Sequence, residues 1–215
     1  MSLKNLLRAG WFRAGLLAWA LAALSACNVL PKSEEITLYR LPAQQTAIKP
    51  KSTTAALEPL FIQTPFAAGP IAGSRVLVVP PNSNEISAYP AVRWQDNAPI
   101  LLRHRLADDF RDTREFKAVV VDSKASYNAQ YELSGELNAF QVEHPKGDPV
   151  VHLLFDAMVA DRANGKTLAS ERFEIVEPVV GKAVPQVIEA FGRASDQLSQ
   201  EVTKWALAHL KAVQR

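Results

Sequence analysis

The residue with the clearest chemistry is Cys27, the only cysteine of the 215-residue chain. It follows Ser25 and Ala26, which themselves follow an apolar run from Ala14 to Leu24. The stretch before that run has no acidic residue and carries Lys4, Arg8 and Arg13. A basic region, an apolar run and small residues in this order are typical of an export signal. The sequence therefore predicts a signal peptide over residues 1–26, with the potentially nucleophilic thiol of Cys27 directly after it.

A permanent transmembrane span is not expected from this leader. Its apolar run of about 11 residues would reach about 17 Å as a helix, against about 30 Å for a hydrocarbon core. Arg13 also prevents the run from extending towards the N-terminus.

The stretch Leu24-Ser25-Ala26-Cys27 resembles the lipobox of bacterial lipoproteins. The resemblance implies cleavage between Ala26 and Cys27, a diacylglyceryl thioether on the Cys27 thiol and an acyl chain on its new amine, with no other cofactor. Several acyl chains would hold the protein firmly to a bilayer. Asn28, in place of the Asp that retains lipoproteins at the inner membrane, implies the periplasmic face of the outer membrane. The alternative is a cysteine that lies by chance beside an ordinary signal sequence.

The composition is that of a globular protein, with 48% hydrophobic and 21% charged residues. The formal net charge is +2, but without the three leader bases the 24 basic residues become 21 against 22 acidic ones. A nucleic-acid partner is not expected, because the body carries no basic surplus to neutralise phosphates.

Residues 27–73 are expected to form a lipidated N-terminus and a proline-rich tether. Six of the fourteen prolines lie here, and such a segment sustains neither helix nor sheet for long. Fully extended, it would reach roughly 150 Å. Within it, Ile36 to Leu41 alternates in a pattern that suits an edge strand, although an unstructured stretch explains it equally well.

A folded domain is expected over residues 74–215. The patterns predict strands over 75–79, 85–94, 116–121, 130–142, 150–161 and 167–176, with a bulge between Leu137 and Phe140 to restore the alternation. Short turns join the last three strands, which should form antiparallel hairpins.

Two helices complete the predicted fold. The first starts at Asn97-Ala98-Pro99. The face opposite its apolar residues is expected to be exposed to solvent, because it carries charges of both signs: Arg103, Arg105, Asp108, Asp109 and Arg111. The second is long and starts at Val184, with an apolar stripe that runs to Trp205. The expected class is α+β, an antiparallel β-sheet with both helices on one face.

No catalytic or metal site is predicted. None of His104, His144, His152 and His209 has a second ligand at metal-binding spacing, and the chain lacks the Gly-x-Ser-x-Gly, P-loop and Gly-x-Gly-x-x-Gly motifs. Five aromatic residues could line a lipid cavity but fit an ordinary core better: Trp94, Phe110, Phe155, Phe191 and Trp205.

Beyond the leader, the order of several short pieces resembles the ABC-type transport auxiliary lipoprotein family. The pieces are Leu77-Val78-Val79-Pro80, Arg93-Trp94-Gln95-Asp96 with Pro99, Tyr131 to Leu137 with Phe140, Glu171-Arg172-Phe173, and the helix that carries Ala190-Phe191, Ala194, Leu198 and Trp205. Cys27 is the only residue of this chain to which the resemblance assigns a functional role. The sequence from Asn82 to Tyr89 differs from the corresponding stretch of family members that belong to paraquat-inducible systems.

This resemblance implies a non-catalytic lipoprotein that works with a transporter of the mammalian-cell-entry (MCE) type. Its partners would be an ATPase, a permease and an MCE substrate-binding protein of the inner membrane. Such systems move phospholipids or other hydrophobic molecules between the two membranes of Gram-negative bacteria. Formation of a homo-oligomer stays open.

Two other functions stay open at this stage. The domain could itself carry a lipid or small ligand in a cavity between the sheet and the long helix. It could also be a purely structural envelope lipoprotein.

Overall fold

A computed structural model describes residues 35–43, 57–121, 124–145 and 147–213. The predicted leader, the cleavage position at Ala26 and the lipidation site Cys27 lie outside these ranges. The chain from Ile36 onward forms one compact unit.

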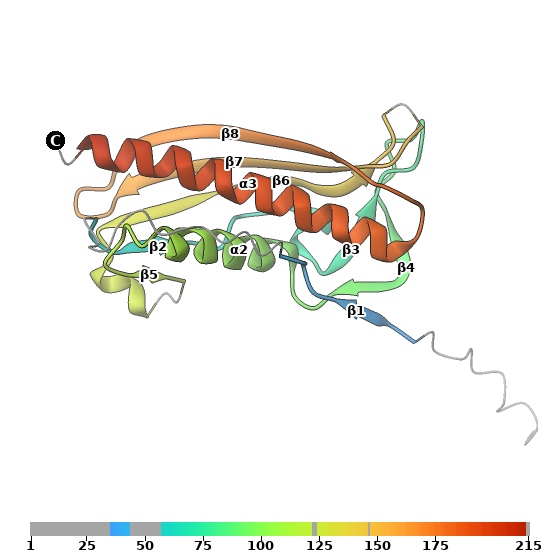
Figure 1. Cartoon of the computed structure of the whole chain (residues 1–215), viewed down its shortest axis with the longest axis horizontal. Coiled ribbons are helices and arrows are strands. Elements are labelled where there is room, and N and C mark those ends of the chain that lie inside the picture. The colour runs from blue at the N-terminus through green and yellow to red at the C-terminus, as the bar shows by residue number, and fades with distance from the viewer. Residues whose placement is uncertain (1–34, 44–56, 122–123, 146, 214–215) are drawn as a thin grey trace, which may run out of the picture. The chain divides into compact units, whose positions relative to one another are not determined.

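The fold is α+β, as predicted (Figure 1). Within the described ranges, eight strands form one sheet and two long helices pack on it. The strands are β1 (Thr37–Tyr39), β2 (Leu60–Ile62), β3 (Arg75–Val78), β4 (Ser87–Trp94), β5 (Val119–Val120), β6 (Tyr131–Glu143), β7 (Val150–Asp161) and β8 (Lys166–Pro178). The helices are α2 (Ala98–Thr113) and α3 (Val184–Val213), with short 3₁₀ turns η2 (Gly69–Ala72) and η3 (Ala125–Asn128).

Strands β6, β7 and β8 form the predicted antiparallel meander. The predicted bulge is present, because the register with β7 shifts between Leu137 and Ala139. The shift keeps Leu137 and Phe140 on the same buried face, opposite Phe155 and Leu153. One extra residue thus reconciles two stretches whose alternation is out of phase.

The sheet is mixed, not antiparallel throughout as expected. The second edge of β6 pairs in parallel with β2 at its start and with β3 at its end, and β2–β5 and β1–β4 are parallel as well. Parallel neighbours need long connections, whereas the sequence patterns revealed only the hairpin turns. Strand β2 was not predicted at all.

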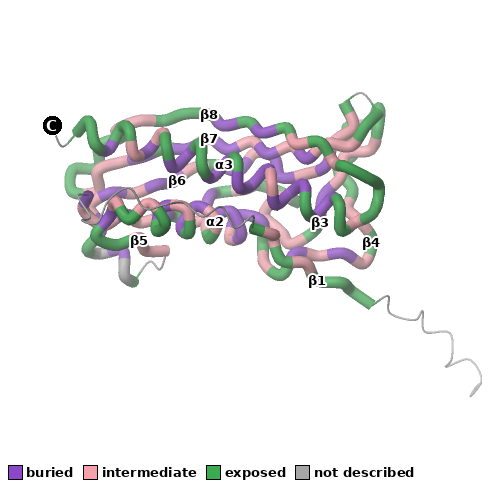
Figure 2. Tube along the Cα trace, in the orientation of Figure 1, coloured by how far each residue is buried: buried purple, intermediate pink, exposed green. Residues whose placement is uncertain are grey.

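Both helices lie on the side of the sheet that holds the core (Figure 2). Helix α3 buries the predicted stripe, including Val187, Phe191, Leu198 and Val202, and its Trp205 is half-buried against Phe173. Among the described residues, neither helix combines the length and the apolar character of a membrane span.

The folded unit starts well before the expected residue 74. Leu57, Leu60 and Ile62 are completely buried, and β2 lies between β5 and β6. Further upstream, β1 occupies the edge of the sheet beside β4. The proline content suggested a tether, but short extended segments between prolines satisfy their backbone groups by joining the sheet.

Candidate functional site

The most constrained feature near the N-terminus is the attachment of residues 37–42 to the rest of the fold. Strand β1 pairs in parallel with β4, with Thr37, Leu38 and Tyr39 opposite Val92, Arg93 and Trp94. The backbone N–H of Gln95 donates a hydrogen bond of 2.8 Å to the carbonyl oxygen of Tyr39. Residues 41 and 42, which follow the strand, then contact helices α2 and α3.

A single arginine holds this segment against both helices. Arg105 of α2 pairs with the carboxylate of Asp196 on α3 and donates to the carbonyl oxygens of Leu41 and Pro42. The ion pair is nearly buried, with side-chain exposures of 10% and 11%. Arginine suits this position because its planar guanidinium supplies several donors in fixed directions.

Close packing against α3 completes the attachment. A Cβ atom placed on Gly192 would lie 2.9 Å from the carbonyl oxygen of Pro42 and 3.0 Å from its Cβ. Only glycine allows the backbone of residue 42 to approach the helix so closely. We call Leu41, Pro42, Arg105, Gly192 and Asp196 the latch.

The helix interface around the latch is polar. Burial raises the pKa of the Asp109 carboxyl, although the hydroxyl of Ser199 and the charge of Arg105 oppose this rise. The Oδ2 atom of Asp109 is buried without a hydrogen-bond partner. The prediction that this face of α2 is exposed to solvent is therefore partly wrong, because Arg105 and Asp109 lie towards α3. Alternating charge on a helix does not show whether a second helix will cover it.

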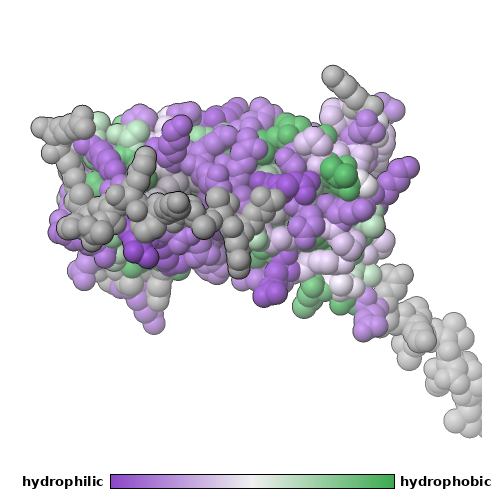
Figure 3. All heavy atoms as spheres, viewed as in Figure 1, coloured by the Kyte–Doolittle hydropathy of each residue, from purple (hydrophilic) through white to green (hydrophobic). Residues whose placement is uncertain are grey.

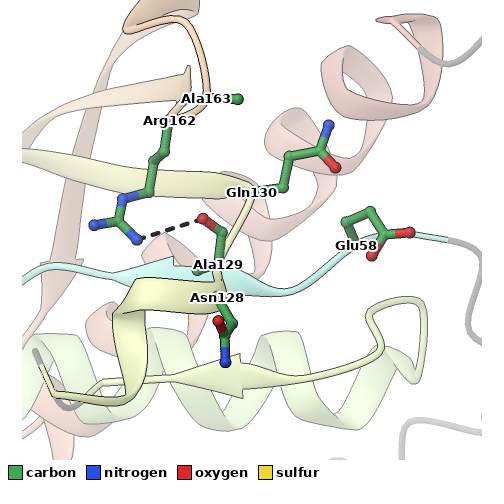
Figure 4. A pocket seen from close by; sticks show the side chains of 6 residues that line it. All are labelled: Glu58, Asn128, Ala129, Gln130, Arg162 and Ala163. Carbon is green, nitrogen blue, oxygen red and sulfur yellow. Dashed lines mark hydrogen bonds between the residues drawn. The ribbon is translucent and has the colours of Figure 1, made fainter.

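A pocket of about 560 Å³ opens at another place in the unit, lined by Glu58, Asn128, Ala129, Gln130, Arg162 and Ala163 (Figure 4). The Arg162 guanidinium is already engaged, with Nε 3.1 Å from Glu132 Oε2 and NH1 3.4 Å from the carbonyl oxygen of Ala129. It also lies over the ring of Phe61, 5.3 Å from its centroid. Four of the six lining residues are polar or charged, whereas a cavity for a hydrophobic cargo is lined mainly by apolar side chains.

The aromatic residues considered for a lipid cavity pack on one another instead. The ring of Phe191 lies 5.1 Å from that of Trp94 and 5.0 Å from that of Phe140. Trp94, Phe110, Phe155 and Phe191 are each at most 1% exposed. These rings fill the space between sheet and α3 where the carrier hypothesis places its cavity.

The four histidines lie in separate places and hold local contacts. His152 bridges Glu143 and Glu174 across three strands at 2.9 Å to each, and this contact, with the Gln141 amide, holds the pKa of Glu143 below its usual value despite burial. His144 and His209 contact the carbonyl oxygens of Val79 and Trp205. Within the described ranges, no group of three His, Cys, Asp or Glu could hold a metal ion.

No local pattern in the sequence predicts the latch. Arg105 lies 63 residues from Pro42 and 91 from Asp196, so no local spacing connects them. The only local signal is Gly192, a glycine within a long helix, which often marks a close contact.

Comparisons with known proteins agree with this fold. The family model for the ABC-type transport auxiliary lipoprotein component matches residues 39–203. Protein XCC0632 from Xanthomonas campestris is 20% identical, with a TM-score of 0.72 over 83% of this chain and 99% of its own. The hypothetical protein CT253 from Chlamydia trachomatis is 9% identical, with a TM-score of 0.52 over 73% and 99% of the two chains. No curated protein matches the chain.

At these identities the structural neighbours establish the fold alone. The family match, in contrast, covers most of the chain, begins within β1 and continues into α3. It includes Leu41, Pro42 and every other residue of the latch. The chain belongs to the family of ABC-type transport auxiliary lipoprotein components.

Proposed function

We propose that the protein is a non-catalytic lipoprotein of the outer membrane that serves as the auxiliary component of an MCE-type ABC transporter. In this role it works with an MCE substrate-binding protein, a permease and an ATPase that move phospholipids or other hydrophobic molecules between the two membranes. The observation that carries the proposal is the family match over residues 39–203, downstream of Leu24-Ser25-Ala26-Cys27.

The latch supports a role in which the folded unit stays close to its anchor. About nine residues separate Cys27 from Ile36, and even a fully extended chain of that length spans only about 30 Å. A long tether that carries the unit across the periplasm is therefore not part of this proposal. The partner must instead come to the membrane that holds the lipid.

The side chains capable of chemistry support a binding role. The described histidines contact carbonyl oxygens, carboxylates or Arg103, and the Arg162 guanidinium in the pocket is held by Glu132 and backbone carbonyls. Tethering at a membrane raises the effective concentration of partners in the same envelope.

The anchor is tested by intact mass and membrane fractionation of the full chain and of Cys27→Ala. We expect the wild type to carry its acyl chains on residue 27 and to fractionate with the outer membrane. Cys27→Ala should lose the acyl mass and leave that fraction. Asn28→Asp is the matched control, because it should keep the acyl mass and move to the inner membrane. A wild-type protein with its leader intact and residue 27 unmodified contradicts the proposal.

The transporter partner is tested by affinity purification of the lipidated protein from detergent-solubilised membranes. We expect an MCE protein, a permease and an ATPase to co-purify with the wild type and to be depleted with Cys27→Ala. Recovery of the lipidated protein without any of the three contradicts the transporter assignment while leaving the anchor intact.

A further inference from the structure

The edge strand β1 presents large apolar side chains to the solvent. Leu38 is 66% exposed and Ile36, just before the strand, is 55% exposed, whereas Tyr39 packs against the core. Residues two apart on a strand lie on the same side, so Ile36, Leu38 and Arg40 share one side of β1. This side of β1 faces away from the core that Tyr39 joins.

Arginines from two neighbouring strands extend the same surface. Leu38 lies opposite Arg93 of β4, and Arg93 lies opposite Arg75 of β3. Opposite residues of paired strands lie on the same face of a sheet, and like charges in that position repel each other. None of the ion pairs within the described ranges involves Arg40, Arg75 or Arg93. A row of arginines without acidic partners favours an anion from outside the chain.

We call this surface the β1 patch; its residues are Ile36, Leu38, Arg40, Arg75 and Arg93. Figure 3 shows apolar and polar atoms side by side at the surface on the lower right, the end at which Figure 1 places β1. Exposed apolar side chains flanked by cations are the combination that binds to a membrane interface carrying anionic lipids.

The short stretch of chain between Cys27 and Ile36 favours a membrane as the occupant of the β1 patch. Ile36 follows Cys27 by only about nine residues, so this end of the patch stays within about 30 Å of a lipid attached there. The latch fixes residues 41 and 42 to α2 and α3, so β1 cannot swing away without breaking those contacts.

We propose that the β1 patch is a phospholipid-binding surface that lies on the bilayer holding the anchor. Ile36 and Leu38 enter the interface and the three arginines bind lipid phosphates. The inference rests on the proposed lipidation of Cys27. It orients the unit, because Pro42, three residues after β1, lies against Gly192 in the first third of α3, whereas Lys211 near the end of α3 pairs with Glu115. The end of α3 therefore lies farther from the lipid than the turn that carries Gly192.

The test uses the full lipidated protein in vesicles of phosphatidylethanolamine and phosphatidylglycerol. Lipidation consumes Cys27, so Leu38→Cys provides a unique thiol for a fluorescent label. Val213→Cys is the control at another exposed apolar position, with 53% exposure against 66% for Leu38. We expect nitroxide lipids to quench the label at 38 at least threefold more strongly than the label at 213. Equal quenching of the two labels on vesicle-bound protein overturns the proposal. Protein that fails to float with vesicles indicates instead that the anchor is missing.

The arginines are tested separately with the labelled Leu38→Cys protein. Arg75→Gln with Arg93→Gln should reduce lipid quenching at least twofold in vesicles that contain phosphatidylglycerol. The control pair Lys166→Gln with Lys204→Gln removes the same charge from exposed sites elsewhere and should leave quenching unchanged. An equal loss from both pairs overturns specific phosphate binding by the patch. Spin-label coupling between copies at residue 38, without lipid quenching, would identify a second protein copy as the occupant and equally overturn it.

Discussion

Arg105 and Asp196 join the two helices through an ion pair that is about nine-tenths buried, and the same arginine binds the carbonyl oxygens of residues 41 and 42. One side chain thus connects α2, α3 and the segment that leads to the predicted anchor. Removing a single partner of a buried pair leaves the other charge without compensation.

Arg105→Met should therefore lower the free energy of unfolding by about 3 kcal/mol, because Asp196 stays buried without its partner. The double variant Arg105→Met with Asp196→Leu should recover most of that loss. Urea denaturation of the purified protein measures both effects. A double variant no more stable than Arg105→Met would show that the carbonyl contacts of the arginine, not the ion pair, provide the stability.

Gly192→Ala tests how firmly residues 37–43 are attached, independently of the stability of the whole fold. Alanine favours the helix by about 1 kcal/mol over glycine, but its Cβ would lie 2.9 Å from the Pro42 carbonyl oxygen. We expect faster amide hydrogen exchange over residues 37–43 with only a small change in global unfolding. Lys204→Ala, at an exposed position of α3, is the control and should leave exchange in that segment unchanged. Protection of residues 37–43 at the wild-type level in Gly192→Ala would contradict close packing at this point.

Gly135 has a comparable role within the sheet. A Cβ there would lie 2.2 Å from the carbonyl oxygen of Asp156 and 2.6 Å from the Phe155 ring. Gly135→Ala should lower the free energy of unfolding by about 1–3 kcal/mol, since the ring has to leave its buried position. Gly73→Ala is the control, because its nearest contact would be 3.4 Å away. Calorimetry measures the melting temperatures of both variants. Equal values would contradict the predicted clash of a Cβ at residue 135.

The parts of the fold that the sequence predicted are those whose information is local. Helix α3 repeats its apolar residues over many turns. Strand β7 alternates along its 12 residues, β6 alternates on either side of one bulge, and turn residues separate β6, β7 and β8. Strand β2 has three residues between Pro59 and Pro65 and is too short to show a period. Its place in the sheet comes from the burial of Leu60 and Ile62 against β6, which is a tertiary effect.

The site was harder to predict for the same reason. Cys27 is recognisable because its signal lies in adjacent residues. The latch depends on contacts between residues far apart in the chain, and Arg105 looks like any exposed helix charge until α3 covers it. The β1 patch depends on register, because nothing in the sequence shows that Leu38, Arg93 and Arg75 are neighbours.

Asp109 should make the stability of the fold depend on pH. Burial raises the pKa of this carboxyl above its ordinary value of 3.8, against the opposing effects of Ser199 and Arg105. The folded state therefore binds this proton more tightly than the unfolded chain, so ionised Asp109 lowers the free energy of unfolding as the pH rises through and above that value. Asp109→Asn should accordingly be more stable than the wild type at pH 7, and the difference should disappear below about pH 3.8. Thermal unfolding across pH 3 to 8 measures this, with the exposed Asp148→Asn as control. An Asp109→Asn protein less stable than the wild type at pH 7 would mean that the interactions of the ionised carboxylate with Arg105 and Ser199 outweigh the cost of burying it.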